Sequence, residues 1–171
     1  PTDNTRPTIP RILKSVDPRY VAAHFGKWDH RTDLAPEHLG YDESDGNTGN
    51  RPGSITSGFD NKEKWRLYTV TEDPKRIFSL TDRSLDFMMR SVEEERPFYL
   101  QISHYAVHVT MQTRQATLDK YEKLPKGEKH NVPAFGGMTE DLDAGVGKIL
   151  DKIDELGIAD STYVIYMADN G

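Results

Sequence analysis

Several side chains that could act together on an anion follow the ends of apolar runs. They are Lys27 after the run at 20–25, His104 and His108 after 97–102, and Asp169 with Asn170 after 162–167. A carboxylate beside an amide is an oxygen donor set that suits Ca²⁺ or Mg²⁺. A lysine supplies positive charge, and a histidine supplies a proton donor. Together these groups favour the hydrolysis of a sulfate or phosphate ester.

Each of these residues also has a simpler interpretation. A lysine after a strand is often a solvated loop residue, and the same holds for His108. Asp-Asn-Gly at 169–171 is a common turn sequence, because all three residue types tolerate positive φ. His24 lies inside the first apolar run and is predicted to be a core residue or to support the site residues from behind. The coincidence of three similar strand endings is what favours a shared site.

The elements that must position these side chains alternate along the chain. Apolar spacing predicts helices near 9–16, 80–94, 116–124 and 138–156, strands at 20–25, 97–102 and 162–167, and a short edge strand at 66–71. Such alternation is typical of an α/β fold with a mainly parallel sheet flanked by helices. Because the carboxyl ends of parallel strands meet at one edge, we expect the lysine, the histidines and the Asp-Asn pair to converge there.

The bulk composition narrows the possible classes of protein. The chain has 171 residues, a formal charge of −6 and no cysteine, and no apolar run approaches the length of a membrane span. Its 22 basic residues are dispersed among 28 acidic ones, which argues against a nucleic-acid partner. The polar, glycine-rich stretch at 31–66 is interpreted as a loop insertion.

Four stretches resemble the sulfatase family of the alkaline phosphatase-like superfamily. They are Gly-Lys-Trp-Asp-His at 26–30, Tyr-Ala-Val-His at 105–108, Glu-Asp-Leu-Asp-Ala-Gly-Val-Gly at 140–147 and Asp-Asn-Gly at 169–171. The resemblance implies an α/β/α sandwich, of which 1–171 would form part of a single catalytic domain. It also implies a sulfuric-ester hydrolase acting on a sulfated small molecule or a sulfated glycan, in a periplasmic, extracellular or lysosomal location.

The same resemblance implies roles for individual residues. Lys27 would contact the sulfate and the nucleophile, and His108 would contact the sulfate or assist the leaving group. Asp169 and Asn170 would bind the metal, usually Ca²⁺ in this family, with Mg²⁺ as the alternative. His30 would also belong to the site, although the family's histidine directly follows the tryptophan and Asp29 intervenes here.

One expected motif is absent from the chain. Sulfatases make a formylglycine nucleophile from Cys or Ser in a Cys/Ser-x-Pro/Ala-x-Arg motif, and residues 1–171 contain no such motif. We therefore expect this chain to be an internal fragment with the nucleophile upstream, inactive by itself. Two rivals stay open, namely a phosphodiesterase or phosphonate hydrolase of the same superfamily and a non-catalytic relative that binds sulfated glycans.

Overall fold

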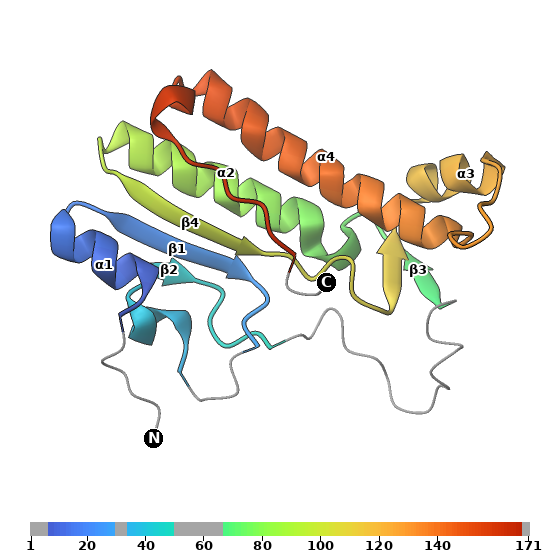
Figure 1. Cartoon of the computed structure of the whole chain (residues 1–171), viewed down its shortest axis with the longest axis horizontal. Helices are drawn as coiled ribbons and strands as arrows, with labels where there is room; N and C mark the ends of the chain where they lie inside the picture. Colours follow the sequence, from blue (N-terminus) through green and yellow to red (C-terminus); the bar gives the residue numbers. More distant parts are fainter. Residues whose placement is uncertain (1–6, 30–33, 50–66, 169–171) are drawn as a thin grey trace.

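The computed structural model of the chain describes residues 7–29, 34–49 and 67–168. Its larger sheet has the order β2-β1-β4 and is parallel throughout (Figure 1). The strands are β1 (Val21–Gly26), β2 (Glu43–Ser44) and β4 (Phe98–Ser103). A second parallel pair joins β3 (Tyr68–Val70) to β5 (Met111–Thr113). The α/β fold with a mainly parallel sheet is therefore confirmed.

The helices lie close to the positions that the apolar spacing predicts. They are α1 (Ile9–Val16), α2 (Ile77–Glu93), α3 (Gln115–Lys123) and α4 (Pro133–Glu155), with short 3₁₀ helices η1 (Pro36–Leu39), η3 (Pro74–Arg76) and η4 (Ala159–Ser161). The predicted edge strand at 66–71 corresponds to β3. Part of the 31–66 stretch also forms regular structure, since it contains η1 and β2.

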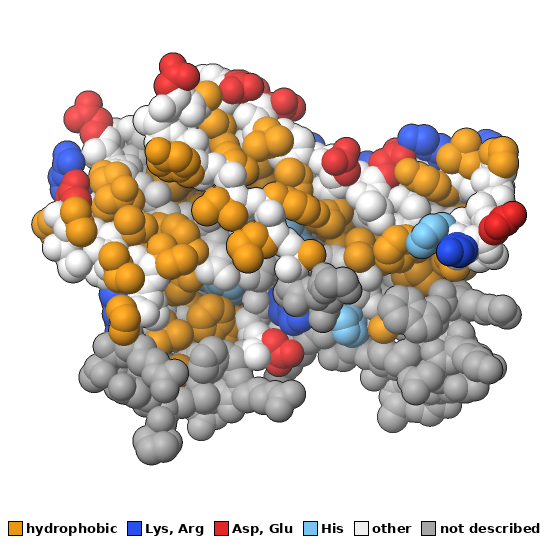
Figure 2. Space-filling model, viewed as in Figure 1, with side chains coloured by type: hydrophobic (Ala, Val, Ile, Leu, Met, Phe, Trp, Pro, Cys, Tyr) orange, Lys and Arg blue, Asp and Glu red, His pale blue; other side chains and the backbone are white. Residues whose placement is uncertain are grey.

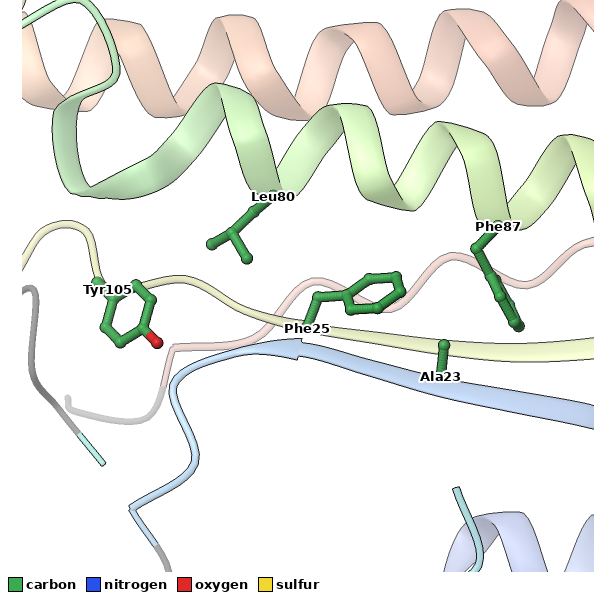
Figure 3. Close-up of a cluster of buried hydrophobic side chains, with 5 residues drawn as sticks. All are labelled: Ala23, Phe25, Leu80, Phe87 and Tyr105. Carbon is green, nitrogen blue, oxygen red and sulfur yellow. The ribbon is translucent and has the colours of Figure 1, made fainter. Parts of the chain in front are cut away.

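The main core lies between α2 and one face of β1 and β4. Ala23 and Phe25 of β1 meet Leu80 and Phe87 of α2, and Tyr105 closes the cluster beyond the end of β4 (Figure 3). Alternate residues of a strand point to opposite faces, so Ala23 and Phe25 share the face that α2 covers. This packing fixes β1 and β4 beneath a rigid helix.

Helix α4 forms a further layer on α2 (Figure 1). The close approach uses Gly145, where a Cβ atom would lie 2.8 Å from Ile77 Cγ2 and 2.9 Å from Thr81 Oγ1. At its other end α4 packs on β5 and α3 through a second apolar cluster, made of Met111, Leu118, Ala134 and Met138. Helix α4 thus ties the two sheets together.

The opposite face of the larger sheet is covered by α1 and residues near η1. Tyr41 packs edge-on against His24 and Trp28, at centroid distances of 5.7 Å and 6.1 Å. Its hydroxyl donates a 2.5 Å hydrogen bond to Gln101 Oε1 of β4. The prediction that His24 is a core residue agrees with its position, because its side chain is fully buried.

The strand predicted at 162–167 is not formed in the structure. Residues 162–168 leave η4 as an irregular segment, and Tyr163, Ile165 and Met167 are 97%, 79% and 80% exposed. A strand needs a hydrogen-bonded neighbour, and none of the described strands pairs with this segment. The apolar, β-branched sequence alone is therefore insufficient to make a strand.

No helix within the described ranges is both long and apolar enough to cross a bilayer.

Candidate active site

Lys27 lies immediately beyond the carboxyl end of β1. The strand ends at Gly26, which has φ +102°, and a Cβ atom there would lie 2.1 Å from the carbonyl oxygen of Ser103. Only glycine accommodates both the positive φ and this contact. The Lys27 amide then donates a 2.7 Å hydrogen bond to the same Ser103 oxygen. The lysine is thereby attached to the ends of two neighbouring strands.

His108 follows the carboxyl end of β4 in a tight turn. Its amide donates to the carbonyl of Tyr105 at 3.1 Å, and its side chain is exposed. The ring Nδ1 lies 2.5 Å from the carbonyl oxygen of Val109. A carbonyl only accepts hydrogen bonds, so Nδ1 is the protonated nitrogen in this contact.

Two of the predicted site residues therefore follow adjacent parallel strands. Gly26 and Ser103 are paired in register, so the segments that carry Lys27 and His108 leave the sheet at the same edge. In Figure 2, Lys/Arg and His side chains reach the visible surface in the region where β1 and β4 end in Figure 1. The other predicted residues, His30, Asp169 and Asn170, lie outside the described residues.

Two further histidines lie near this edge, His24 fully buried and His104 half-buried. Burial lowers the pKa of His24 to about 4 and that of His104 to about 4. Within the described chain, their Nδ1 atoms and the Tyr105 hydroxyl are the buried side-chain polar atoms without a hydrogen-bond partner. Nε2 of His24 lies 3.0 Å from Ser103 Oγ. At pH 7 neither imidazole adds positive charge to the edge.

Two residues to which the sequence analysis assigned no role also reach this edge. Asp45 accepts a hydrogen bond from the Gly26 amide, and Thr48 contacts the backbone on both sides of Lys27. The sequence contains a signal for them, namely polar residues of the type that bond to backbone groups, inside the stretch at 42–49. That signal does not indicate which backbone they bind.

The described residues do not by themselves form a metal centre. No group of three or more His, Cys, Asp or Glu side chains within them could hold an ion. The oxygen donors that suit Ca²⁺ or Mg²⁺ are the predicted Asp169 and Asn170, beyond the last described residue. What the described edge offers is a lysine and an exposed imidazole, a pair that suits binding an anion and protonating a leaving oxygen.

The amino-acid sequence matches one protein family and several of its curated members. The family model described as Sulfatase matches residues 1–171. N-acetylgalactosamine-6-sulfatase of Canis lupus familiaris is 25% identical over 95% of this chain and 32% of its own length. Arylsulfatase A of Homo sapiens is 30% identical over 50% of this chain and 15% of its own length. The chain spans about a third of the length of the N-acetylgalactosamine-6-sulfatases it matches.

Solved structures show the same fold. The crystal structure of Ps i-CgsB aligns with a TM-score of 0.61 and 17% identity, covering 90% of this chain and 38% of that one. Ps i-CgsB in complex with k-i-k-neocarrahexaose aligns with a TM-score of 0.57 and 18% identity, covering 85% of this chain and 36% of that one. At these identities the likeness concerns the fold.

Proposed function

Because the chain belongs to the sulfatase family, we propose that it forms part of a single catalytic domain that hydrolyses sulfuric esters. The main support for the proposal is the position of two side chains at the end of the larger sheet. Lys27 and His108 follow the paired ends of two parallel strands, where Gly26 is in register with Ser103. Ligands of open α/β sheets bind outside the carboxyl ends of the strands, so these side chains belong to the edge where a substrate is expected.

In this proposal Lys27 binds the sulfate group. Its ammonium is a point charge that stabilises the negative charge developing on the sulfuryl oxygens during attack. His108 protonates the leaving oxygen through Nε2, the ring nitrogen that does not face the Val109 carbonyl. His30 contributes to the same site beyond the tryptophan. A formylglycine outside residues 1–171 would supply the attacking oxygen.

The donor types at the end of the chain fit an alkaline-earth ion. We propose that Asp169 and Asn170 contribute carboxylate and amide oxygens to Ca²⁺, with Mg²⁺ as the alternative. When bound, such an ion would offset the negative charge of the sulfate and of the nucleophile. Residues 162–168 run toward the end of the sheet where β1 and β4 stop (Figures 1 and 3).

The substrate class follows from the proteins to which the chain is similar. N-acetylgalactosamine-6-sulfatase is named for a sulfated sugar, and Ps i-CgsB has been solved with a neocarrahexaose. These names support a sulfated glycan or a small sulfated molecule as the substrate. The chain's own formal charge of −6 gives no support to a nucleic-acid partner.

The test compares ester types on the full-length protein that contains this chain. An aryl sulfate should be hydrolysed faster than the matched aryl phosphodiester or phosphonate, and Lys27→Ala should lower kcat/KM by about 100-fold or more. Lys129→Ala, in an exposed loop, is the control and should leave the rate unchanged.

Three results would contradict the proposal. Preferred hydrolysis of the phosphodiester would favour the phosphodiesterase alternative. Binding of a sulfated glycan without turnover would favour a non-catalytic relative. A wild-type rate for Lys27→Ala would remove Lys27 from the site.

A further inference from the structure

The backbone that carries Lys27 is held on both of its sides. On the β4 side, the Lys27 amide donates to Ser103 at 2.7 Å. On the opposite side, residues 45–49 follow β2 and run past the end of β1. There the Gly49 amide donates to the Trp28 carbonyl at 2.9 Å, forming an isolated antiparallel bridge. The segment that bears the lysine is thus part of an extended hydrogen-bonded ladder.

Thr48 contributes one hydroxyl to both peptide units that flank Lys27. Thr48 Oγ1 donates to the Gly26 carbonyl at 2.7 Å and accepts the Trp28 amide proton at 2.9 Å. The Gly26 carbonyl belongs to the peptide unit before the Lys27 Cα, and the Trp28 amide belongs to the one after it. A single side chain therefore fixes both backbone dihedrals of the lysine.

Asp45 holds the preceding residue by its carboxylate. Its Oδ2 accepts the Gly26 amide proton at 2.8 Å, while its Oδ1 pairs with the Arg83 guanidinium. The Asp45 side chain is only 5% exposed, so its charge needs this partner. Arg83 in turn lies over the ring of Phe25, 4.4 Å from its centroid. The core helix α2 is thereby connected to the strand end.

We propose that Thr48 and Asp45, with Arg83 behind Asp45, are positioning residues for Lys27. The inference rests on the proposed sulfatase function, and it adds residues outside the family-like motif at 26–30. A lysine side chain keeps several rotamers, so aiming its ammonium at a sulfuryl group requires at least a fixed Cα. Small displacements of a charged group at an active site cost large factors in turnover.

The chain contains its own control for this proposal. Asp42 binds a backbone amide near the start of β1, as Asp45 does at the end of the strand. The Oδ2 atom of Asp42 accepts the Ala22 amide proton at 2.8 Å and forms an ion pair with Lys14 at 2.6 Å. Ala22 is four residues before Gly26, about 13 Å along a strand. A change at Asp42 removes the same kind of contact far from Lys27.

The experiment uses four variants of the full-length protein and a good aryl sulfate substrate. Thr48→Val removes the hydroxyl and should lower kcat about 10- to 100-fold with a smaller change in KM, whereas Thr48→Ser keeps the hydroxyl and should restore turnover. Asp45→Asn should lower kcat, while Asp42→Asn should lower only the thermal midpoint.

A double variant distinguishes a role of Thr48 in positioning Lys27 from a general effect of Thr48 on the structure. In a Lys27→Ala background, Thr48→Val should cause little further loss, because the group it positions is gone. Full multiplication of the two losses would overturn the proposal, as would equal kcat for Thr48→Val and Thr48→Ser. Absence of sulfatase activity in the wild type, or a wild-type rate for Lys27→Ala, would instead overturn the proposed function.

Discussion

At the residue scale, the proposed roles of Lys27 and His108 differ in how they depend on the substrate. In the proposal, Lys27 would act on the sulfuryl group, which is common to all sulfate esters. His108 would act on the leaving oxygen, whose basicity varies from one ester to the next. The Nδ1 contact with Val109 orients the imidazole for that second role. The two residues can therefore be distinguished by changing the leaving group.

We predict that His108→Gln impairs hydrolysis most for poor leaving groups. Protonation matters little for an acidic phenol and much for an alkyl alcohol, where general acid catalysis contributes about 100- to 10,000-fold. The measurement is kcat/KM for a series of aryl and alkyl sulfates with the wild type and the variant. A loss of the same size for every ester would instead assign His108 to sulfate binding.

The buried His24 gives a prediction about how stability depends on pH. Burial lowers the pKa of His24 to about 4, and His104 shifts in the same direction. Between this value and the unfolded pKa of about 6.5, the unfolded chain binds more protons than the folded one. The stability contributed by neutral His24 is therefore fully present above about pH 6.5 and is lost as pH falls toward about 4. At pH 5 the free energy of unfolding should be lower than at neutral pH by about 2 kcal/mol.

The corresponding measurement is the free energy of unfolding of the full-length protein from pH 7 to pH 4.5. His24→Gln, which can still bond to Ser103, should flatten the decline over this range, and His130→Gln in an exposed loop should leave it unchanged. An identical decline in wild type and His24→Gln would show that folding does not lower the pKa of His24.

At the element scale, α4 is anchored to β5 and α3 by one buried carboxylate. Asp141 is fully buried and accepts hydrogen bonds from the Arg114 amide at 3.0 Å and from its Nε at 2.7 Å. Thr117 Oγ1 donates to the same carboxylate at 3.1 Å. Since α4 also packs on α2, this contact helps hold the smaller sheet against the larger one.

We predict that Asp141→Ala strongly destabilises the protein. The change leaves buried donors without partners and separates an ion pair, which typically costs about 3 to 5 kcal/mol. Asp143→Ala is the matched control, because Asp143 lies two residues further along α4 and is exposed. Denaturant unfolding of both variants checks the prediction, and equal midpoints would contradict it.

Sequence patterns predicted elements best where the pattern is long and locally determined. Helix α4 is recognisable from its apolar stripe, and Gly157 after it has φ +67° as a helix stop requires, although the helix begins at Pro133 and not at residue 138. The start of α2 was wrong by three residues. The spacing predicts a start at residue 80, whereas the helix begins at Ile77 and Asp73 Oδ1 accepts the Phe78 amide proton at 2.8 Å.

Elements that depend on distant partners could not be predicted. Strand β2 has only two residues and exists because β1 lies beside it. The segment at 162–167 shows the reverse case: its sequence favours a strand, but no described strand pairs with it, and it stays irregular. The side-by-side ends of β1 and β4 could be expected from a parallel sheet, whereas the contact of Thr48 with the lysine backbone depends on a loop path that no pattern encodes.

At the scale of the whole molecule, exposed apolar side chains accompany the outer strand of the larger sheet. Strand β4 is at one end of the sheet order and pairs with β1 alone among the described strands. Tyr163 and Ile165 are 97% and 79% exposed, and Figure 2 shows hydrophobic side chains over much of this face. An unpaired strand edge beside exposed apolar residues favours association with another strand.

We predict that residues 1–171 alone have no sulfatase activity and bind Ca²⁺ weakly. The formylglycine motif is absent from these residues, so the covalent step cannot occur. Ca²⁺ takes about six to eight oxygen ligands, and Asp169 with Asn170 supply only a part of that number. An aryl-sulfate assay with calorimetric Ca²⁺ titration checks both points, and measurable turnover or tight binding would show that a complete site exists within this chain.

The isolated chain should also self-associate through the β4 edge and the segment at 162–167. Burial of exposed apolar side chains drives the association, so its extent should rise with protein concentration and fall when Ile165 is changed to Lys. Leu150→Lys, on the exposed side of α4, introduces the same charge elsewhere and should leave the association unchanged. Light scattering across a concentration series distinguishes the variants. A monomer at all concentrations would mean that the β4 edge is protected in solution, whereas equal effects of the two lysines would place the association on the helical face instead.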